Sequence, residues 1–197
     1  AGHMTRDYVI ACHGWLSPAR RGVDAPIHFQ EEEPGTSSTV RQGGKPAKTL
    51  LKLLSHLVRG AAEACSLVAV RIATGRRHQI RAHCAHVGLP VCGDGRYASA
   101  EAFQQDRRWC CRHLLHRCRL AFRDAVRAGR RVEAAPPTDF LEAVAGLRAA
   151  RGGMTPLEVL DEFVREGGGW HWEGDGVARP EKVAIASRAE CTSGLCQ

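Results

Sequence analysis

The sequence lacks the features that mark membrane and secreted proteins. None of its apolar runs approaches the roughly 18 residues that a membrane-spanning helix needs. No charged-then-apolar leader is present, and the nine cysteines form no C-x-x-C pair. An odd number of cysteines without a leader argues against a disulfide framework. We therefore expect a soluble protein with reduced thiols in a reducing, intracellular compartment.

Acidic residues are also absent from one long stretch, between Glu63 and Asp94. The whole chain of 197 residues carries a net charge of +7, which an arginine-rich proteome alone could produce. The distribution is more informative than the total, because this stretch holds four arginines and three histidines: Arg71, Arg76, Arg77, Arg81, His78, His83 and His86. A surface of one sign predicts a partner that presents phosphate groups.

Composition divides the chain into unequal parts. Residues 1–4, Ala-Gly-His-Met, resemble a cloning remnant, so we expect that native sequence upstream of Thr5 is missing from this chain. The main domain is expected at 5–150, with a flexible insertion rich in Glu, Gly and Ser at 31–46. A helix and a glycine-rich extension are expected at 151–197.

Hydrophobic periodicity and end signals predict the local elements. Strands are expected at 8–12, 66–72 and 113–123, while 49–59 fits either a strand or a helix. Helices are expected at 78–87, from Ser99 to about 105, at 139–149 after a Thr138 cap, and from the Thr155–Glu158 capping box to 166.

Residues 74–83, Thr-Gly-Arg-Arg-His-Gln-Ile-Arg-Ala-His, combine a strand end, a tight turn and a helix start. A helix N-terminus offers free N–H groups and partial positive charge to an anion. Arg76, Arg77, His78 and Gln79 lie around this start, and Arg81 is expected on the same helix face as Arg77 because it is four residues further on. The alternative is a helix start whose arginines only face solvent.

This segment resembles the third motif of the RluA-type pseudouridine synthases, T-G-R-x-H-Q-I/L-R-x-H. The family motif continues as G-x-P-I/V-x-G-D-x-x-Y, which residues 88–97 match from Gly88 to Tyr97. Residues 8–14 resemble its tyrosine motif, 114–122 its leucine-histidine strand and 136–140 its closing proline-aspartate segment. The resemblance extends over about residues 6–149.

The resemblance implies an α+β fold, a mostly antiparallel mixed sheet with packed helices, and it favours a strand at 49–59. It implies conversion of uridine to pseudouridine in rRNA or tRNA without a metal or an organic cofactor. Tyr8 would stack near the uracil and serve as base, and Arg81 would pair with the catalytic aspartate and lower its pKa. Arg76, Arg77, His78, Gln79 and His83 would contact RNA. Simpler alternatives are a strand tyrosine at Tyr8 and a structural salt bridge at Arg81.

The family's nucleophilic aspartate lies in an H-R-L-D-x-x-T-S-G motif, which this sequence does not contain. Asp7, Asp24 and Asp94 do not have that context. Two interpretations follow: the C-terminal portion of an enzyme whose aspartate lies upstream, or a non-catalytic RNA-binding relative, for instance a ribosome-associated protein. In either case this chain alone is expected to be inactive, and a missing segment or partner is expected to cover exposed sheet edges.

Two other sites have weaker support. Residues 110–118 contain Cys110, Cys111, His113, His116 and Cys118, but one strand points them to opposite faces, so no metal is expected there. Gly43-Gly44-Lys45 lacks the following Ser or Thr and the glycine frame of a nucleotide-binding loop.

Overall fold

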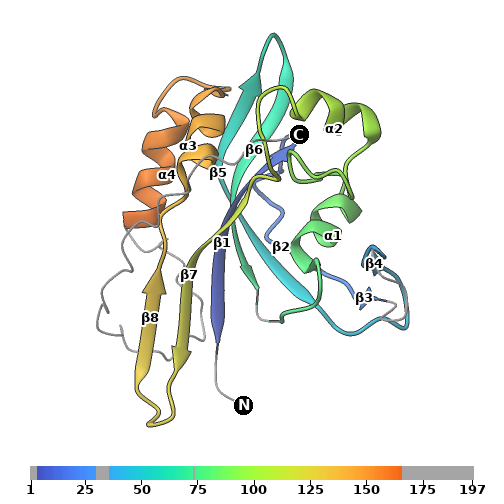
Figure 1. Cartoon of the computed structure of the whole chain (residues 1–197), viewed down its shortest axis with the longest axis vertical. Helices are drawn as coiled ribbons and strands as arrows, with labels where there is room; N and C mark the ends of the chain where they lie inside the picture. The colour runs from blue at the N-terminus through green and yellow to red at the C-terminus, as the bar shows by residue number, and fades with distance from the viewer. Residues whose placement is uncertain (1–3, 30–35, 73, 166–197) are drawn as a thin grey trace.

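The computed structural model describes residues 4–29, 36–72 and 74–165, which form nine strands and four helices (Figure 1). The strands are β1 (Thr5–His13), β2 (Gly22–Asp24), β3 (Ile27–His28), β4 (Thr39–Val40), β5 (Lys48–Arg59), β6 (Glu63–Ile72), β7 (Leu115–Arg123), β8 (Gly129–Glu133) and β9 (Arg148–Ala149). The helices are α1 (Gln79–His86), α2 (Ala100–Asp106), α3 (Thr138–Ala145) and α4 (Pro156–Arg165). None of the described helices is long and apolar enough to cross a membrane.

One large sheet organises the chain, in the order β2-β5-β6-β1-β7-β8, with β9 beside β5. Every strand pair that the structure describes is antiparallel, which confirms the expected α+β fold. The ambiguous segment at 49–59 is the long strand β5, joined to β6 by a tight turn at Gly60. The central strands β1 and β6 are buried along most of their length, because helices cover both faces.

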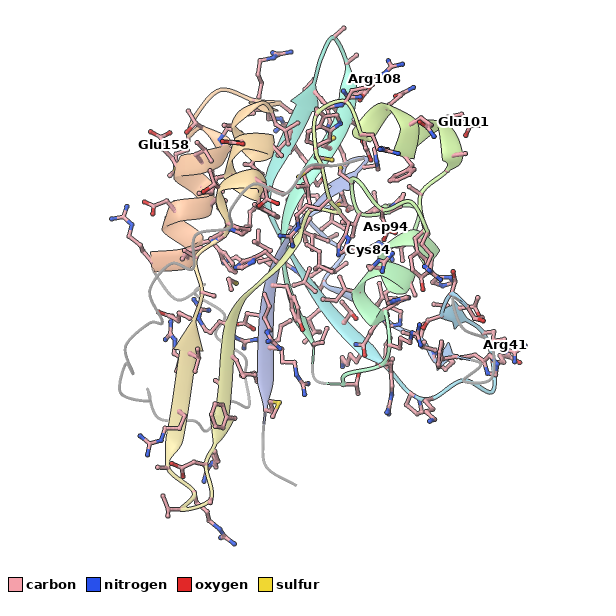
Figure 2. The ribbon with its side chains drawn as sticks, viewed as in Figure 1. Arg41, Cys84, Asp94, Glu101, Arg108 and Glu158 are labelled. Atoms are coloured by element: carbon pink, nitrogen blue, oxygen red, sulfur yellow. The ribbon has the colours of Figure 1, made fainter. Side chains whose placement is uncertain are left out.

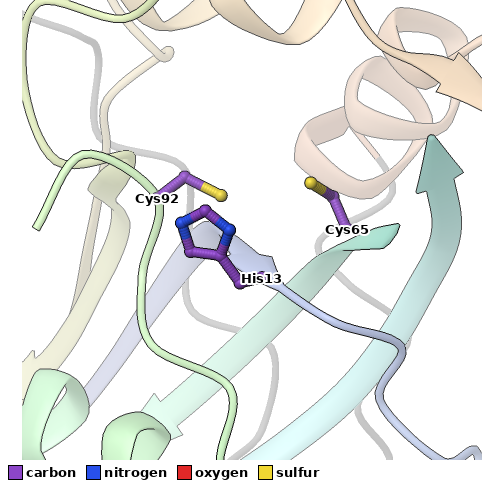
Figure 3. A group of neighbouring side chains, drawn as sticks. All are labelled: His13, Cys65 and Cys92. Atoms are coloured by element: carbon purple, nitrogen blue, oxygen red, sulfur yellow. The ribbon is translucent and has the colours of Figure 1, made fainter. Parts of the chain in front are cut away.

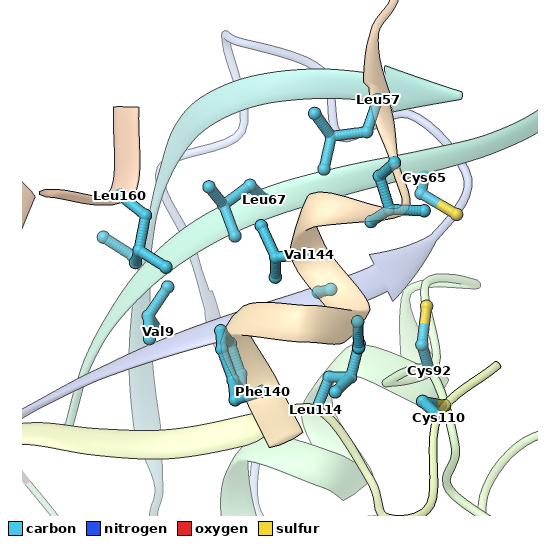
Figure 4. Packing of buried hydrophobic residues seen from close by; sticks show 14 of the residues in the cluster. Val9, Leu57, Cys65, Leu67, Cys92, Cys110, Leu114, Phe140, Val144 and Leu160 are labelled. Carbon is cyan, nitrogen blue, oxygen red and sulfur yellow. The ribbon is translucent and has the colours of Figure 1, made fainter. Parts of the chain in front are cut away.

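The two faces of the sheet carry separate apolar clusters. Val9 and Leu67 point to the face that α3 and α4 cover, where Phe140 and Leu160 pack against them (Figure 4). Ile10 and Val68 point to the other face, where Ile80 of α1 packs. Figure 1 shows α3 and α4 on one side of the sheet and α1 and α2 on the other. Side chains alternate between faces along a strand, so the two clusters share the same strands.

The chain differs from expectation after residue 123. The strand β8 was not predicted, because its one large apolar residue, Val132, is 47% exposed and gives no periodic signal. The helix predicted at 139–149 is α3 and ends at Ala145; Arg148 and Ala149 instead pair with β5 as β9. Thr138 does not cap α3, since the N-cap position belongs to Pro137. Pairing with a distant strand is a non-local interaction that local propensity cannot reveal.

The helix α4 begins at the predicted capping box. The Glu158 carboxylate accepts from the Thr155 backbone N–H at 2.7 Å, and the Thr155 hydroxyl accepts from the Glu158 N–H at 3.3 Å. Leu160 and Phe163 of this helix are buried in the same cluster as Val9. The glycine-rich extension expected after 166 and residues 30–35 of the insertion lie outside the described residues.

Leu160→Ala should lower the free energy of unfolding of the whole chain by about 2–5 kcal/mol, because it leaves a cavity in the shared cluster. Leu157→Ala, on the exposed side of the same helix, is the matched control and should change it by less than about 0.5 kcal/mol. Denaturant unfolding followed by circular dichroism measures both. A Leu160→Ala chain that loses only its last helix, with the main transition unchanged, would show that α4 unfolds independently of the sheet.

Candidate active site

After the turn that follows β6, the helix α1 begins one residue later than predicted. His78 occupies the N-cap with φ of 52°, the left-handed region that a non-glycine residue rarely adopts. Arg77 therefore precedes the helix, and its guanidinium lies 4.3 Å from the centre of the Phe29 ring. The expectation that Arg77 and Arg81 share one helix face is wrong for this reason.

Gln79 is buried and makes every hydrogen bond that its carboxamide can make. Its oxygen accepts from the Thr74 hydroxyl at 2.8 Å and from the Arg76 N–H at 3.0 Å. Its nitrogen donates to the Lys48 carbonyl at 2.9 Å and to the Thr49 hydroxyl at 3.1 Å. A buried amide with all its bonds satisfied ties the turn and α1 to the start of β5.

His83 is fully buried and continues the same network. Its Nε2–H donates to the Ala25 carbonyl at 2.9 Å, so its Nδ1 is the acceptor for the Thr49 hydroxyl at 2.8 Å. Burial lowers the pKa of His83, which agrees with a neutral ring in this role. Gln79 and His83 thus fix the motif from the protein interior through their hydrogen bonds, and neither side chain reaches the surface.

Arg81 is paired with an aspartate, and that aspartate belongs to this chain. Its Nε and Nη2 donate to the two carboxylate oxygens of Asp94, each at 2.6 Å. Asp94 is fully buried and also accepts from the backbone N–H groups of Arg96 and Tyr97. The Arg81 guanidinium lies 5.0 Å from the centre of the Tyr97 ring. This bidentate pair fixes the direction of Arg81.

The pair shifts both pKa values in the expected directions. The hydrogen bond to Asp94 raises the pKa of Arg81. Burial alone would raise the pKa of Asp94, but the Arg81 and Arg96 hydrogen bonds outweigh it and hold that pKa below its ordinary value. Both groups are therefore charged across the neutral range.

His78 is the residue of the motif that faces both the network and the surface. Its Nδ1 lies 3.1 Å from the Tyr97 hydroxyl, which also accepts from the Ser38 N–H at 2.8 Å. Burial, followed by repulsion from Arg81 and Arg77, lowers the pKa of His78. His78 therefore offers a neutral ring rather than a positive charge at pH 7.

The exposed arginines of the motif belong to a larger group, called here the basic edge and made of Arg41, Lys45, Arg76 and Arg77, all exposed. Arg76 donates from Nε to the Pro46 carbonyl, next to Lys45. Arg41 contacts His28, next to the Phe29 ring under Arg77. Figure 2 shows Arg41 at the outer end of the molecule beside α1. Sequence analysis missed Arg41 and Lys45, because the fold brings them to the motif.

Tyr8 is half-buried on β1 and packs against the cluster that contains Ile10 and Ile80, on the face covered by α1. Asp7, the neighbouring residue, is buried and bound by Arg71 at 2.6 Å and Arg119 at 3.1 Å. Adjacent strand residues point to opposite faces, so Asp7 faces away from Tyr8. Arg6 shares the side of the motif, since a Cβ at Gly75 would lie 3.4 Å from its Nη1.

Comparisons with known proteins find RNA pseudouridine synthases. The sequence model of the RNA pseudouridylate synthase family matches residues 1–86. The uncharacterized RNA pseudouridine synthase YlyB of Bacillus subtilis is 33% identical over 147 residues, 74% of this chain and 45% of that protein. The dual-specificity RNA pseudouridine synthase RluA of Escherichia coli is 34% identical over 111 residues, 56% of this chain and 47% of that protein.

This chain belongs to the RluA-type pseudouridine synthase family. The solved structure of human RNA pseudouridylate synthase domain containing 1 has the same fold, with a TM-score of 0.62 and 24% identity over 83% of this chain and 66% of that chain. The chain spans about half the length of the curated RluA-type relatives it matches.

Replacing Asp94 with Asn should lower the free energy of unfolding by about 3 kcal/mol at pH 7, since it leaves Arg81 buried without its partner. The folded pKa of Asp94 lies below its ordinary value of about 3.9. The pair therefore stabilises the chain fully above that value and loses its contribution as the pH falls through the folded pKa. The difference between Asp94→Asn and wild type should shrink accordingly in acid.

The matched control is Asp161→Asn, which removes an exposed pair with Arg165 on α4. It should change the unfolding free energy little at any pH, because exposed ion pairs contribute about 0–1 kcal/mol. Urea unfolding at stepwise pH values measures both variants. An Asp94→Asn cost that stays constant down to the lowest pH at which the chain folds would contradict the ionised pair.

Proposed function

We propose that this chain forms the RNA-binding and supporting part of an enzyme that isomerises uridine to pseudouridine in rRNA or tRNA. The observation that carries the proposal is the Arg81–Asp94–Tyr97 arrangement, which lies directly beside the basic edge. The family membership gives the reaction class. The nucleophilic aspartate is proposed to come from polypeptide outside this sequence.

The reaction places specific demands on these residues. The bond between N1 and the ribose C1′ breaks, a bond between C5 and C1′ forms, and a proton leaves C5 while N1 gains one. Arg81, oriented by Asp94, would hold the attacking carboxylate ionised and aligned. Tyr8, on the same face of the sheet, would stack near the uracil and accept the C5 proton.

The basic edge would hold the RNA backbone while the uridine is rotated out of its stack. Enzymes that act on a base inside a strand extrude it into a pocket, and contacts to phosphate supply much of their affinity. Arg76 and Arg77 carry this role with Arg41 and Lys45. His78, neutral at pH 7, would serve as a hydrogen-bonding group rather than a counter-charge.

The second candidate function is RNA binding without turnover. It is favoured by the state of two aspartates near the site. Asp7 and Asp94 are both buried and saturated by arginine, so neither is available as a nucleophile. The sequence also contains no H-R-L-D motif.

The double substitution Arg76→Ala and Arg77→Ala should weaken RNA binding at every salt concentration. The slope of log affinity against log salt should become shallower by about 1 to 2. Each phosphate contact that is lost lowers the number of counterions released on binding by about 0.7–0.9. Filter binding or fluorescence anisotropy with a uridine-containing hairpin, from low to moderate salt, measures the slope. The thermal midpoint should stay near wild type because both residues are exposed.

The matched control is Arg107→Ala with Arg108→Ala, two exposed arginines at the end of α2. Figure 2 shows Arg108 at the top of the molecule and Arg41 at its right-hand edge. The control removes the same charge, so it isolates position from net charge. An equal loss of affinity in both double variants would mean that total charge alone drives binding and that the basic edge has no special part.

Isomerisation is tested by the release of tritium from RNA labelled at C5 of uridine. The 197-residue chain alone should release no tritium. A longer protein that contains both this chain and an H-R-L-D motif should release it. In that protein Tyr8→Phe should lower kcat by about 100-fold or more, since it removes the proposed base. Arg41→Ala should raise the KM with little change in kcat. If the longer protein released no tritium, the isomerase function would be wrong and RNA binding without turnover would remain.

A further inference from the structure

Three residues far apart in the sequence bring metal-binding atoms together on the face of the sheet opposite α1. His13 ends β1, Cys65 lies near the start of β6, and Cys92 follows the turn after α1. Their ligand atoms, one ring nitrogen and two thiol sulfurs, all lie within 4.8 Å of one another. Figure 3 shows the Cys92 thiol beside the His13 imidazole and the Cys65 thiol to the right of both. Among the residues that the structure describes, this is the one group of three or more His, Cys, Asp or Glu side chains placed closely enough to hold a metal ion.

His13 and Cys65 lie on paired strands, and backbone hydrogen bonds hold Cys92, which lies in a turn, against them. His13 and Cys65 are direct partners in the antiparallel register of β1 and β6. Cys92 is held by two backbone hydrogen bonds, from its N–H to the Ala11 carbonyl at 3.0 Å and from the Leu114 N–H to its own carbonyl at 2.8 Å. Residues that are fixed by backbone hydrogen bonds in this way keep their arrangement without a ligand.

We propose that His13, Cys65 and Cys92 form a binding site for a thiophilic divalent cation, best fitted by Zn²⁺. Thiolate and imidazole are the ligands that zinc prefers, at about 2.3 Å and about 2.0–2.1 Å. Tetrahedral coordination with those lengths separates two sulfurs by about 3.8 Å and a sulfur from a nitrogen by about 3.6 Å. The present separations are no more than 4.8 Å, so each atom needs to move by less than about 1 Å.

The surroundings of His13 match those of a zinc-binding histidine. Its Nε2 donates to the Asp106 carboxylate at 2.9 Å, which leaves Nδ1 as the ligand atom. Asp106 is fully buried and fixed by the Gly93 N–H at 2.6 Å and the Trp109 indole N–H at 3.2 Å. A carboxylate that orients the ring in this way is the usual outer contact of a histidine ligand.

The site is closed on one side and reachable on the other. Cys65 and Cys92 are buried, whereas the His13 side chain is 24% exposed and gives an ion a path inward. The fourth position has a nearby candidate in Cys110, whose sulfur would lie 3.0 Å from a Cβ placed on Gly93. With Cys110 the site would be closed and structural; with water it would be open. The proposal is independent of RNA binding and turnover.

The first experiment measures zinc directly. The 197-residue chain, purified in reductant and stripped with a chelator, should take up one Zn²⁺ per chain in a titration read by a competing chromophore. Cys65→Ser and Cys92→Ser should lose this uptake. Cys84→Ser and Cys118→Ser, which alter buried cysteines outside the group, should retain it. Asp106→Asn should lower the affinity about 10–100-fold, as expected for an outer contact.

The second experiment uses Co²⁺ as a probe, so that a variant that folds poorly does not decide the outcome. Co²⁺ bound to thiolates gives a sulfur-to-metal charge-transfer band and d–d bands of tetrahedral intensity. His13→Gln, at the most exposed position, should shift the d–d bands while circular dichroism confirms the fold. Loss of band intensity in Cys110→Ser would assign the fourth ligand to Cys110, and an unchanged band would assign it to water.

Two results would overturn the proposal. One is a wild-type affinity for Zn²⁺ that is no higher than the affinity of Cys65→Ser. The other is a thiol count in unfolded, unreduced protein that is lower by two in wild type but not in Cys65→Ser. That result would mean that Cys65 and Cys92 form a disulfide instead.

Discussion

The Gln79 carboxamide joins three parts of the chain that are far apart in sequence: the turn after β6, the start of β5 and the first residue of α1. Its bond to Thr49 continues through His83 to the carbonyl of Ala25. Each donor in this row has an acceptor, and the Thr49, Gln79 and His83 side chains at its centre are buried. Losing one member would leave others without partners in a low-dielectric interior, which costs far more than one exposed hydrogen bond. The position of α1, and with it the direction of Arg81, depends on this row.

Charge is used in two different ways around α1. Asp94 is buried and Arg81 is largely buried, and the bidentate pair is fixed, so its value lies in orientation as much as in energy. The arginines and the lysine of the basic edge are exposed, which suits the proposed contact with a flexible anionic partner. A polynucleotide needs both kinds of contact: one to place a single nucleotide and others to hold its backbone.

Much of the fold could be predicted from sequence, because its signals are local. The strands β1 and β6, the N-cap at Ser99 and the Thr155 box all depend on neighbours within a few residues. The strands β8 and β9 depend on partners far along the chain and carry little apolar pattern, so they could not be found. The motif at 74–83 located the site, but Gln79 and His83 were expected at the RNA surface. Their burial depends on Thr49, Lys48 and Ala25, and no local pattern reveals those contacts. Strand register likewise brings His13 to Cys65, and the turn after Val91 adds Cys92 to them.

Gly93 has a φ of 75°, and a Cβ there would lie 2.4 Å from the carbonyl oxygen of Arg112. Its neighbours on either side belong to different sites: Cys92 is a proposed metal ligand, and Asp94 holds Arg81. One short turn of the backbone is therefore common to both. A metal ion that shifted this turn on binding at the proposed site would also shift Asp94, and RNA bound at the proposed second site would then change the affinity for the metal by the same factor. The two proposed sites are separated along the backbone by one residue that has no side chain.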